Sequence, residues 1–219
     1  MPEGRKVIAS PTRKFVIQIV DPRTKCVVSE SVFETSDIAA LCEIIDPEAS
    51  EIPVGVGYDL EKDDVQRIES RFDVAIECGL NVARLRSWIL IDGLPYKVHT
   101  NRELTLMLKG VKPFAAFSEL YAPGSDEEFI PETTFQPYVE SKLLTKVERI
   151  LSVKGRDIRF VLYARSGEEW RINAYMLLQQ TAQKVSWNEG FERMEGSLLG
   201  YTEWENDICI KEIYARPRG

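Results

Sequence analysis

The hydrophobic pattern in the first part of the chain changes from a period of two to a period of about 3.6. Residues 15–20 form a run of β-branched and aromatic side chains, residues 21–25 carry turn residues, and residues 26–33 return as a second run. Hydrophobic residues then recur at i, i+3, i+4 and i+7 over residues 38–45, and Pro47 ends the repeat. A β-hairpin followed by a helix is therefore predicted.

The next stretch adds a strand, a helix and a second hairpin pattern. Residues 54–58 predict a short strand, and the helical spacing of residues 65–72 predicts a helix. Residues 82–91 predict a strong strand, Asp92-Gly93 a turn and residues 96–98 a return strand.

His99, the only histidine, follows this hairpin pattern directly. Thr100 to Glu103 match a capping box, which predicts a short helix behind them. His99 would then precede the helix cap, where a histidine packs against the first turn or points to solvent. A structural role is the favoured interpretation, and a binding role stays open because helix-start loops often carry binding groups.

A third hairpin pattern occupies residues 158–184. Residues 158–164 are strand-like, Ser166-Gly167 marks a turn, and residues 170–175 alternate as a return strand would. The same residues also fit a helix that begins at Ser166, but we favour the hairpin, followed by a helix over residues 175–184. The three patterns are suggestive of an internal ββα repeat.

Residues 122–137 are predicted to form one long loop with three prolines and an acidic stretch. Such loops are uncommon within compact domains, so this loop is either a boundary between lobes or a lid over a site. The chain is thus a single domain over residues 1–219, or two lobes over residues 12–121 and 138–215. Residues 139–151 fit both periods and receive no assignment.

The predicted fold class is α+β, with antiparallel β-hairpins each followed by a helix. The C-terminal segment is predicted to be helical, because Phe191, Met194 and Leu198 share one helical face. Thr202 to Glu205 match another capping box, which predicts a further helix start.

Composition and charge narrow the class of protein. Hydrophobic residues make up 44% and charged residues 29% of the 219 residues, as in a globular chain with a conventional core. The net charge of -7, from 28 Lys and Arg against 35 Asp and Glu, gives no overall support to nucleic-acid binding. Arg84 and Arg86 would share one strand face as a local basic pair, although a solvated strand face is the favoured interpretation.

A cytoplasmic location is predicted. The N-terminus leads into polar residues without the apolar region of a secretory signal, and no stretch approaches the roughly 18 apolar residues of a membrane span. The four cysteines are scattered, which favours reduced, buried side chains. No membrane partner is expected.

Motifs for metals and nucleotides are incomplete. One histidine cannot form the H-E-x-x-H motif of zinc hydrolases, and the cysteines form no C-x-x-C pair. The chain also lacks a Walker A sequence. Asp126 with Glu140 and Lys142 has the E-x-K order of many nucleases, but such triples arise by chance in a highly charged chain. No metal and no cofactor are predicted.

The candidates for catalysis are His99, Glu168, Glu169 and Arg171. Carboxylates beside an arginine suit a hydrolase such as a metal-dependent phosphodiesterase or nuclease. This hypothesis requires Arg171, His99 and either Glu168 or Glu169 to converge on one concave pocket.

The most distinctive stretch is residues 187–207, which combines large aromatic side chains with an acidic surround. This combination is typical of a protein-binding hot spot, and also of an amphipathic pair of helices. The predicted binding residues are Trp187, Phe191, Tyr201 and Trp204. The favoured hypothesis is a non-catalytic cytoplasmic protein that binds another protein, as an inhibitor, immunity or adaptor protein does. The alternative is the carboxylate and arginine hydrolase.

Overall fold

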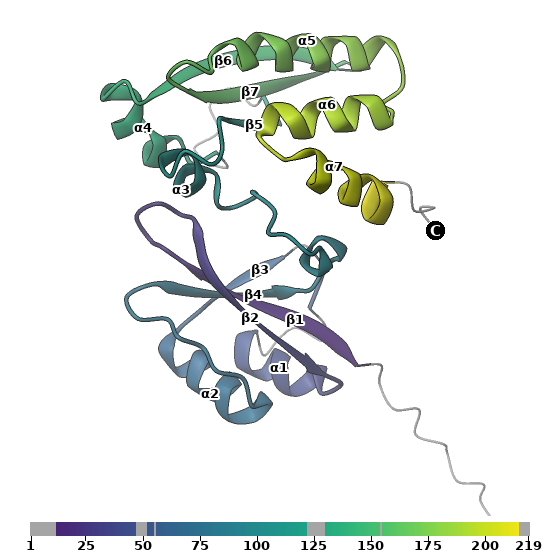
Figure 1. Ribbon diagram of the computed structural model, residues 1–219. Coiled ribbons are helices and arrows are strands. Elements are labelled where there is room, and N and C mark those ends of the chain that lie inside the picture. Colours follow the sequence, from purple (N-terminus) through teal and green to yellow (C-terminus); the bar gives the residue numbers. More distant parts are fainter. Residues whose placement is uncertain (1–11, 47–51, 55, 122–129, 154, 215–219) are drawn as a thin grey trace, which may run out of the picture. The chain divides into compact units, whose positions relative to one another are not determined.

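The computed structural model describes residues 12–46, 52–54, 56–121, 130–153 and 155–214 (Figure 1). The chain divides into two compact units. Unit 1 comprises residues up to Asp92 except 23–25, and unit 2 comprises residues 23–25 and Gly93 onward. The division falls at residues 92 and 93, so the residues on both sides of the 122–129 segment belong to unit 2.

Unit 1 contains a four-stranded antiparallel sheet in the order β2-β1-β4-β3. The β1–β2 hairpin followed by α1 confirms the first predicted hairpin and helix. The elements are β1 (Arg13–Val20), β2 (Val27–Thr35), α1 (Ile38–Ile45), β3 (Gly57–Leu60), α2 (Lys62–Phe72), β4 (Val82–Ser87) and the short 3-10 helix η1 (Leu90–Gly93).

The core of unit 1 lies between this sheet and its two helices. Phe15, Ile17 and Ile19 alternate along β1 and therefore point to the same side of the sheet. Leu41 of α1 and Ile68 of α2, both fully buried, pack into the same cluster. Figure 1 shows α1 and α2 on that one side of the sheet. The hydrophobic side chains predicted from the strand pattern and from the helix pattern thus pack together in one core.

Unit 2 contains a three-stranded antiparallel sheet in the order β5-β7-β6. The hairpin of β6 and β7 is followed by α5, which makes a second hairpin-and-helix arrangement. The elements are α3 (Glu103–Leu108), β5 (Phe114–Leu120), α4 (Glu132–Glu140), β6 (Leu144–Val153), β7 (Arg156–Arg165), α5 (Trp170–Lys184), α6 (Glu189–Leu199), α7 (Glu203–Cys209) and the π-helical turn η2 (Ile210–Tyr214).

Helices pack on both faces of the unit 2 sheet. On one face, Leu162 of β7 packs with Ile172 of α5 and Leu198 of α6 in the main cluster. On the other face, the Phe135 ring of α4 stacks on the Tyr163 ring of β7 with centroids 4.2 Å apart. Alternation along β7 therefore supplies apolar side chains to both layers.

Two of the predicted hairpins are wrong. Residues 96–98 form no strand, because β4 already pairs with β1 and β3 and the chain turns into η1. The Asp92 carboxylate closes this turn by accepting the Ile89 N–H at 2.8 Å. Residues 170–175 begin α5 instead of forming a strand, because β5 and β6 occupy both sides of β7. For residues 170–175 the alternative interpretation, a helix that begins near Ser166, is therefore closer to the structure.

Other boundaries also differ from the sequence predictions. The second part of the predicted 122–137 loop belongs to α4, and the unassigned residues 139–151 divide between the end of α4 and β6. Residues 122–129 lie outside the described part of the chain. The capping box predicted at Thr100 is wrong, because the short helix after His99 begins only at Glu103 and its first turn makes no side-chain cap hydrogen bond. Asn101, which that prediction placed in the helix, has a left-handed conformation with φ 61°. The capping box at Thr202, by contrast, is confirmed at the start of α7.

Candidate functional site

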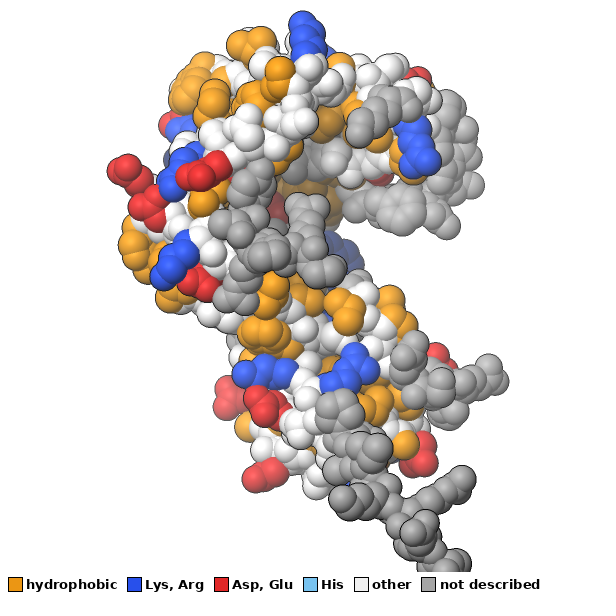
Figure 2. Space-filling model, turned by 90° about the vertical axis from the view of Figure 1, so that its right-hand side faces the viewer, with side chains coloured by type: hydrophobic (Ala, Val, Ile, Leu, Met, Phe, Trp, Pro, Cys, Tyr) orange, Lys and Arg blue, Asp and Glu red, His pale blue; other side chains and the backbone are white. Residues whose placement is uncertain are grey.

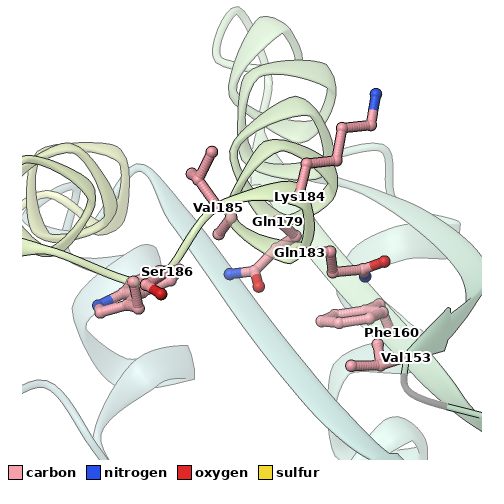
Figure 3. A pocket seen from close by; sticks show the side chains of 9 residues that line it. Val153, Phe160, Gln179, Gln183, Lys184, Val185 and Ser186 are labelled. Atoms are coloured by element: carbon pink, nitrogen blue, oxygen red, sulfur yellow. The ribbon is translucent and has the colours of Figure 1, made fainter.

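A pocket of about 730 Å³ opens in unit 2 where the C-terminal end of α5 meets the β6–β7 hairpin. Its size is in the range of pockets that hold small molecules or anchoring side chains. Figure 3 shows side chains that line it from the two strands, the helix and the segment after the helix. The lining residues are Val153, Phe160, Gln179, Ala182, Gln183, Lys184, Val185, Ser186 and Trp187.

One wall of the pocket is a face of α5. Gln179, Ala182 and Gln183 follow each other at i, i+3 and i+4, so they lie on the same side of the helix. Val185 has extended backbone angles and ends the helix, so the chain crosses back toward the sheet at this point. Trp187 lies in the crossing segment and closes the pocket on that side. The wall thus combines two amide groups with apolar surface.

The floor of the pocket is apolar. Phe160 of β7, 6% exposed, belongs to the main core cluster of unit 2, and Val153 lies at the end of β6. In the β6–β7 ladder, Arg149 stands opposite Phe160 and Arg156 stands opposite Val153. Directly opposed residues share a face of the sheet, so both arginines stand beside the floor.

Trp187 is fixed by contacts with the start of α6. Its Nε1–H donates to the Glu192 carboxylate at 2.7 Å, and its ring lies 5.8 Å from the Phe191 ring. Gln179 of the opposite wall donates to Glu195 at 3.1 Å. Burial, together with the nearby Glu192 carboxylate, raises the pKa of Glu195. Two carboxylates of α6 therefore hold the walls of the pocket in place.

The four predicted binding residues fall into two groups. Trp187 and Phe191 lie at the start of α6, whereas Tyr201 and Trp204 follow its end. The 11 residues of α6 separate the groups by roughly 16 Å at the usual helical rise. Trp204 is 53% exposed and meets the Tyr96 ring edge-on at 5.8 Å. Among the four, Trp187 alone lines the pocket.

His99 is buried in a polar cluster at the end of α6. Its ring stacks on Tyr201 with centroids 4.0 Å apart, and its backbone N–H donates to the Tyr201 hydroxyl at 2.8 Å. The Lys112 Nζ lies 3.5 Å from the His99 Nδ1 and donates to the Leu199 carbonyl at 3.1 Å. His99 and Lys112 are 6% and 2% exposed, so the cluster is closed to solvent.

This closed setting changes the proton affinity of both bases. Burial, and then the Lys112 ammonium group, lower the pKa of His99 to about 4. Burial also lowers the pKa of Lys112 to about 8, against the opposing charge of Glu103. Burial raises the pKa of Glu103 in turn. Near neutral pH the imidazole is therefore neutral and accepts from Lys112, which suits a packing role.

The remaining candidates for catalysis fasten one end of α5. The Arg171 Nε donates to Glu168 at 2.8 Å, and its Nη1 donates to the Ser197 and Leu198 carbonyls at 2.9 and 3.1 Å. The hydrogen bond from Arg171 lowers the pKa of Glu168. Glu169 precedes α5 and accepts from the Thr145 hydroxyl. Arg171 thus binds the last turn of α6, where carbonyls are exposed.

The local basic pair of unit 1 is neutralised by carboxylates. Arg84 and Arg86 do share one sheet face, but Arg84 pairs with Asp59 at 2.6 Å and Arg86 pairs with Asp92 at 2.5 Å. Figure 2 shows basic and acidic side chains next to one another at several places on the face that it presents. The face that Arg84 and Arg86 share is therefore not a basic strip, because each of the two charges is paired with a carboxylate.

A charge cluster on the α4 face of unit 2 escaped the sequence analysis. Arg159 of β7 pairs with Glu119, Glu132 and Glu148 at 2.8, 2.7 and 2.7 Å. Lys146 also pairs with Glu132. The hydrogen bond from Arg159 lowers the pKa of Glu148. These residues come from four separate elements, so no sequence spacing announces the cluster, and its evident role is to fasten α4 to the sheet.

The described residues offer no group of three or more His, Cys, Asp and Glu side chains placed to hold a metal ion. Asp126, which with Glu140 and Lys142 has the nuclease-like order, lies outside the described ranges. Within those ranges, no helix has the length and apolar character needed to cross a membrane.

Comparisons of the chain with protein-family models, with curated proteins and with solved structures found no match. Function is therefore inferred from the residues and their geometry.

Proposed function

We propose that this chain is a non-catalytic protein that acts in the cytoplasm by binding another protein, as an inhibitor, immunity or adaptor protein does. The pocket beside Trp187 is the observation that carries this proposal. Its apolar floor and its aromatic wall suit one anchoring side chain of a partner, and buried aromatic anchors dominate the energy of most interfaces.

The amide groups of the pocket support a peptide occupant. Figure 3 shows the side chains of Gln179 and Gln183 extending from α5 beside Phe160. A glutamine amide both donates and accepts, so it matches the N–H and C=O groups of a peptide backbone. Gln179 already donates to Glu195, which leaves its oxygen as an acceptor and places Gln183 as the second polar contact.

Trp204 is proposed as a second contact of the same interface. The Trp204 side chain is half-exposed. An interface of standard size covers about 800 Å² on each partner, which is enough to include both Trp187 before α6 and Trp204 after it. Phe191 and Tyr201 support these two tryptophans, because Phe191 packs beside Trp187 and Tyr201 meets the Tyr96 ring that also contacts Trp204.

The contacts of the catalytic candidates also favour binding over catalysis. Arg171 and Glu168 are held in helix-end contacts, and the His99 imidazole is enclosed beside Lys112. Cys26, Cys42, Cys78 and Cys209 form no disulfide, which agrees with a reducing compartment.

Affinity capture from an extract of the host, with a matched pair of variants, tests the proposal. Ala182→Trp places a large side chain in the pocket wall. Asn173→Trp adds the same side chain nine residues earlier, half a turn out of phase and so on the opposite side of α5. We expect wild type and Asn173→Trp to recover the same partner in near-equal amount, and Ala182→Trp to lose it. Recovery by all three, or by none, would contradict the proposal.

A further inference from the structure

The pocket is bordered by cations that the described structure leaves without an opposing charge. Arg149 and Arg156 stand opposite the two floor residues, and Lys184 lines the pocket at the end of α5. All three side chains are exposed. Within the described ranges none of them makes an ion pair, and the Arg149 Nη1 donates only to the Glu148 carbonyl. Figure 3 shows the Lys184 ammonium group extending away from Phe160, so it lies at the border of the pocket.

This arrangement differs from that of Arg84, Arg86, Arg159 and Arg171, each of which meets a carboxylate at 2.8 Å or less. In a chain with a net charge of -7, these three cations stand beside one pocket, and the carboxylates at its walls, Glu192 and Glu195, already accept hydrogen bonds from Trp187 and Gln179. Cations without an ion-pair partner beside a pocket favour a partner group with negative charge.

We propose that the pocket binds an acidic segment of the partner protein, with one apolar side chain as its anchor. The anchor would lie on Phe160 and Val153, and carboxylates on either side of it would meet Arg149 and Arg156. This inference rests on the proposed binding function and adds the chemistry of the partner. Local complementarity of this kind directs the partner to one site, since the acidic remainder of the surface repels it.

A protein segment fits these features better than a nucleic acid. Strong binding to nucleic acid requires many phosphate contacts, on the order of six to ten, and the border of the pocket supplies three cations. The apolar floor also matches a hydrocarbon or aromatic side chain, and the glutamine amides match a peptide backbone.

Fluorescence anisotropy with the 219-residue chain tests the inference. The probe is a labelled peptide with a central phenylalanine flanked by glutamates. Its controls are a peptide with glutamines in place of the glutamates, a peptide with glycine in place of the phenylalanine, and a single-stranded thymidine oligonucleotide. The variant Arg149→Gln/Arg156→Gln removes two border charges, and Lys62→Gln/Lys109→Gln removes two exposed charges elsewhere.

We expect the acidic phenylalanine peptide to bind at least tenfold more tightly than either control peptide. Binding should weaken about fivefold in Arg149→Gln/Arg156→Gln, as for two partly exposed ion pairs, and stay unchanged in Lys62→Gln/Lys109→Gln. Equal binding of the glutamine peptide, tighter binding of the oligonucleotide, or equal loss in both double variants would overturn the inference.

The two proposals fail in different ways. If the captured partner is lost with Ala182→Trp but retained with Arg149→Gln/Arg156→Gln, the binding function stands and the acidic-segment inference is wrong. If Ala182→Trp retains the partner, the pocket is not the binding site and the proposed function itself is wrong.

Discussion

Acid should destabilise unit 2 through its single histidine. The pKa of His99 is about 4 in the folded chain and near 6.5 when the side chain is free in water. Between these two values the unfolded chain binds a proton that the folded chain does not. The free energy of unfolding therefore falls as the pH is lowered from 6.5 to 4, and the His99 contribution to this loss is absent above that window and complete below it.

The size of the effect follows from the same two values. Each tenfold difference in proton affinity corresponds to about 1.4 kcal/mol, so protonation of His99 removes roughly 3 kcal/mol. The main physical cause is the burial of the imidazolium ion away from water. The second is its repulsion by Lys112, 3.5 Å away, which is itself charged throughout this window because its pKa is about 8. The Glu205 carboxylate and the Leu199 carbonyl oppose the effect, and Arg102 adds to it.

The assay is urea unfolding of wild type and His99→Gln at pH 7 and pH 4. Tryptophan fluorescence reports mainly on unit 2, which contains Trp170, Trp187 and Trp204. Carboxylates titrate equally in both proteins, so the difference between the two pH-dependent losses isolates the histidine. A proton NMR titration measures its pKa directly, because one histidine gives one set of imidazole resonances. A pKa of 6 or above, with equal losses in both proteins, would refute the reasoning.

Three further substitutions test the packing of unit 2. Gly200→Ala should lower the free energy of unfolding by about 2 kcal/mol or more, because φ is +92° and the added Cβ would lie 2.3 Å from Pro113. The control Gly167→Ala, with φ +87° and open space around the added Cβ, should lower it by about 1 kcal/mol. Similar losses for the two variants in denaturant melts would argue against the close contact at Gly200. Arg159→Met should lower the free energy of unfolding by about 2 kcal/mol at pH 7 and by less as the pH falls through the lowered pKa values of Glu132 and Glu148, and a pH-independent loss would count against the ion-pair network. Trp204→Ala should weaken partner binding by about 2 kcal/mol in calorimetry while the melting temperature stays within a few degrees, and loss of folding would place Trp204 in the core instead.

Local patterns in the sequence predicted those elements that depend on local interactions. The first hairpin has a turn-rich connection between two β-rich runs, and the capping box at Thr202 places a helix start by contacts within four residues. The helical period of residues 191–198 likewise predicts α6, although Met194, predicted on its apolar face, is 55% exposed while Leu198 is buried. Each of these elements depends only on near neighbours, and the structure confirms that each one forms.

Elements that depend on distant partners were not predictable in this way. Residues 88–91 continue the apolar run of β4, yet β4 ends at Ser87 because a carboxylate five residues further on draws the chain into a turn. Residues 170–175 satisfy both periods, and the choice of helix depends on β5 and β6 occupying the two sides of β7. Sequence periodicity contains no information about which sheet edges are already filled.

The candidate site shows the same limit. Trp187 was identified from its aromatic and acidic surroundings, but Phe160 and Val153 are ordinary strand residues until the β6–β7 ladder brings them beneath α5. Gln183 and Arg156 are likewise unremarkable in sequence. The pocket exists because the end of α5 and the segment after it lie beside the β6–β7 hairpin, which is a property of the tertiary fold.

Hydrogen exchange measured by mass spectrometry, with and without the captured partner, tests the central claim most directly. The proposed binding site predicts slower amide exchange over residues 149–160 and 179–187 in the complex, and unchanged exchange in β1, β2 and β4 of unit 1. Unchanged amide exchange in both of these segments, with slower exchange elsewhere in the chain, would contradict the assignment of this pocket as the binding site.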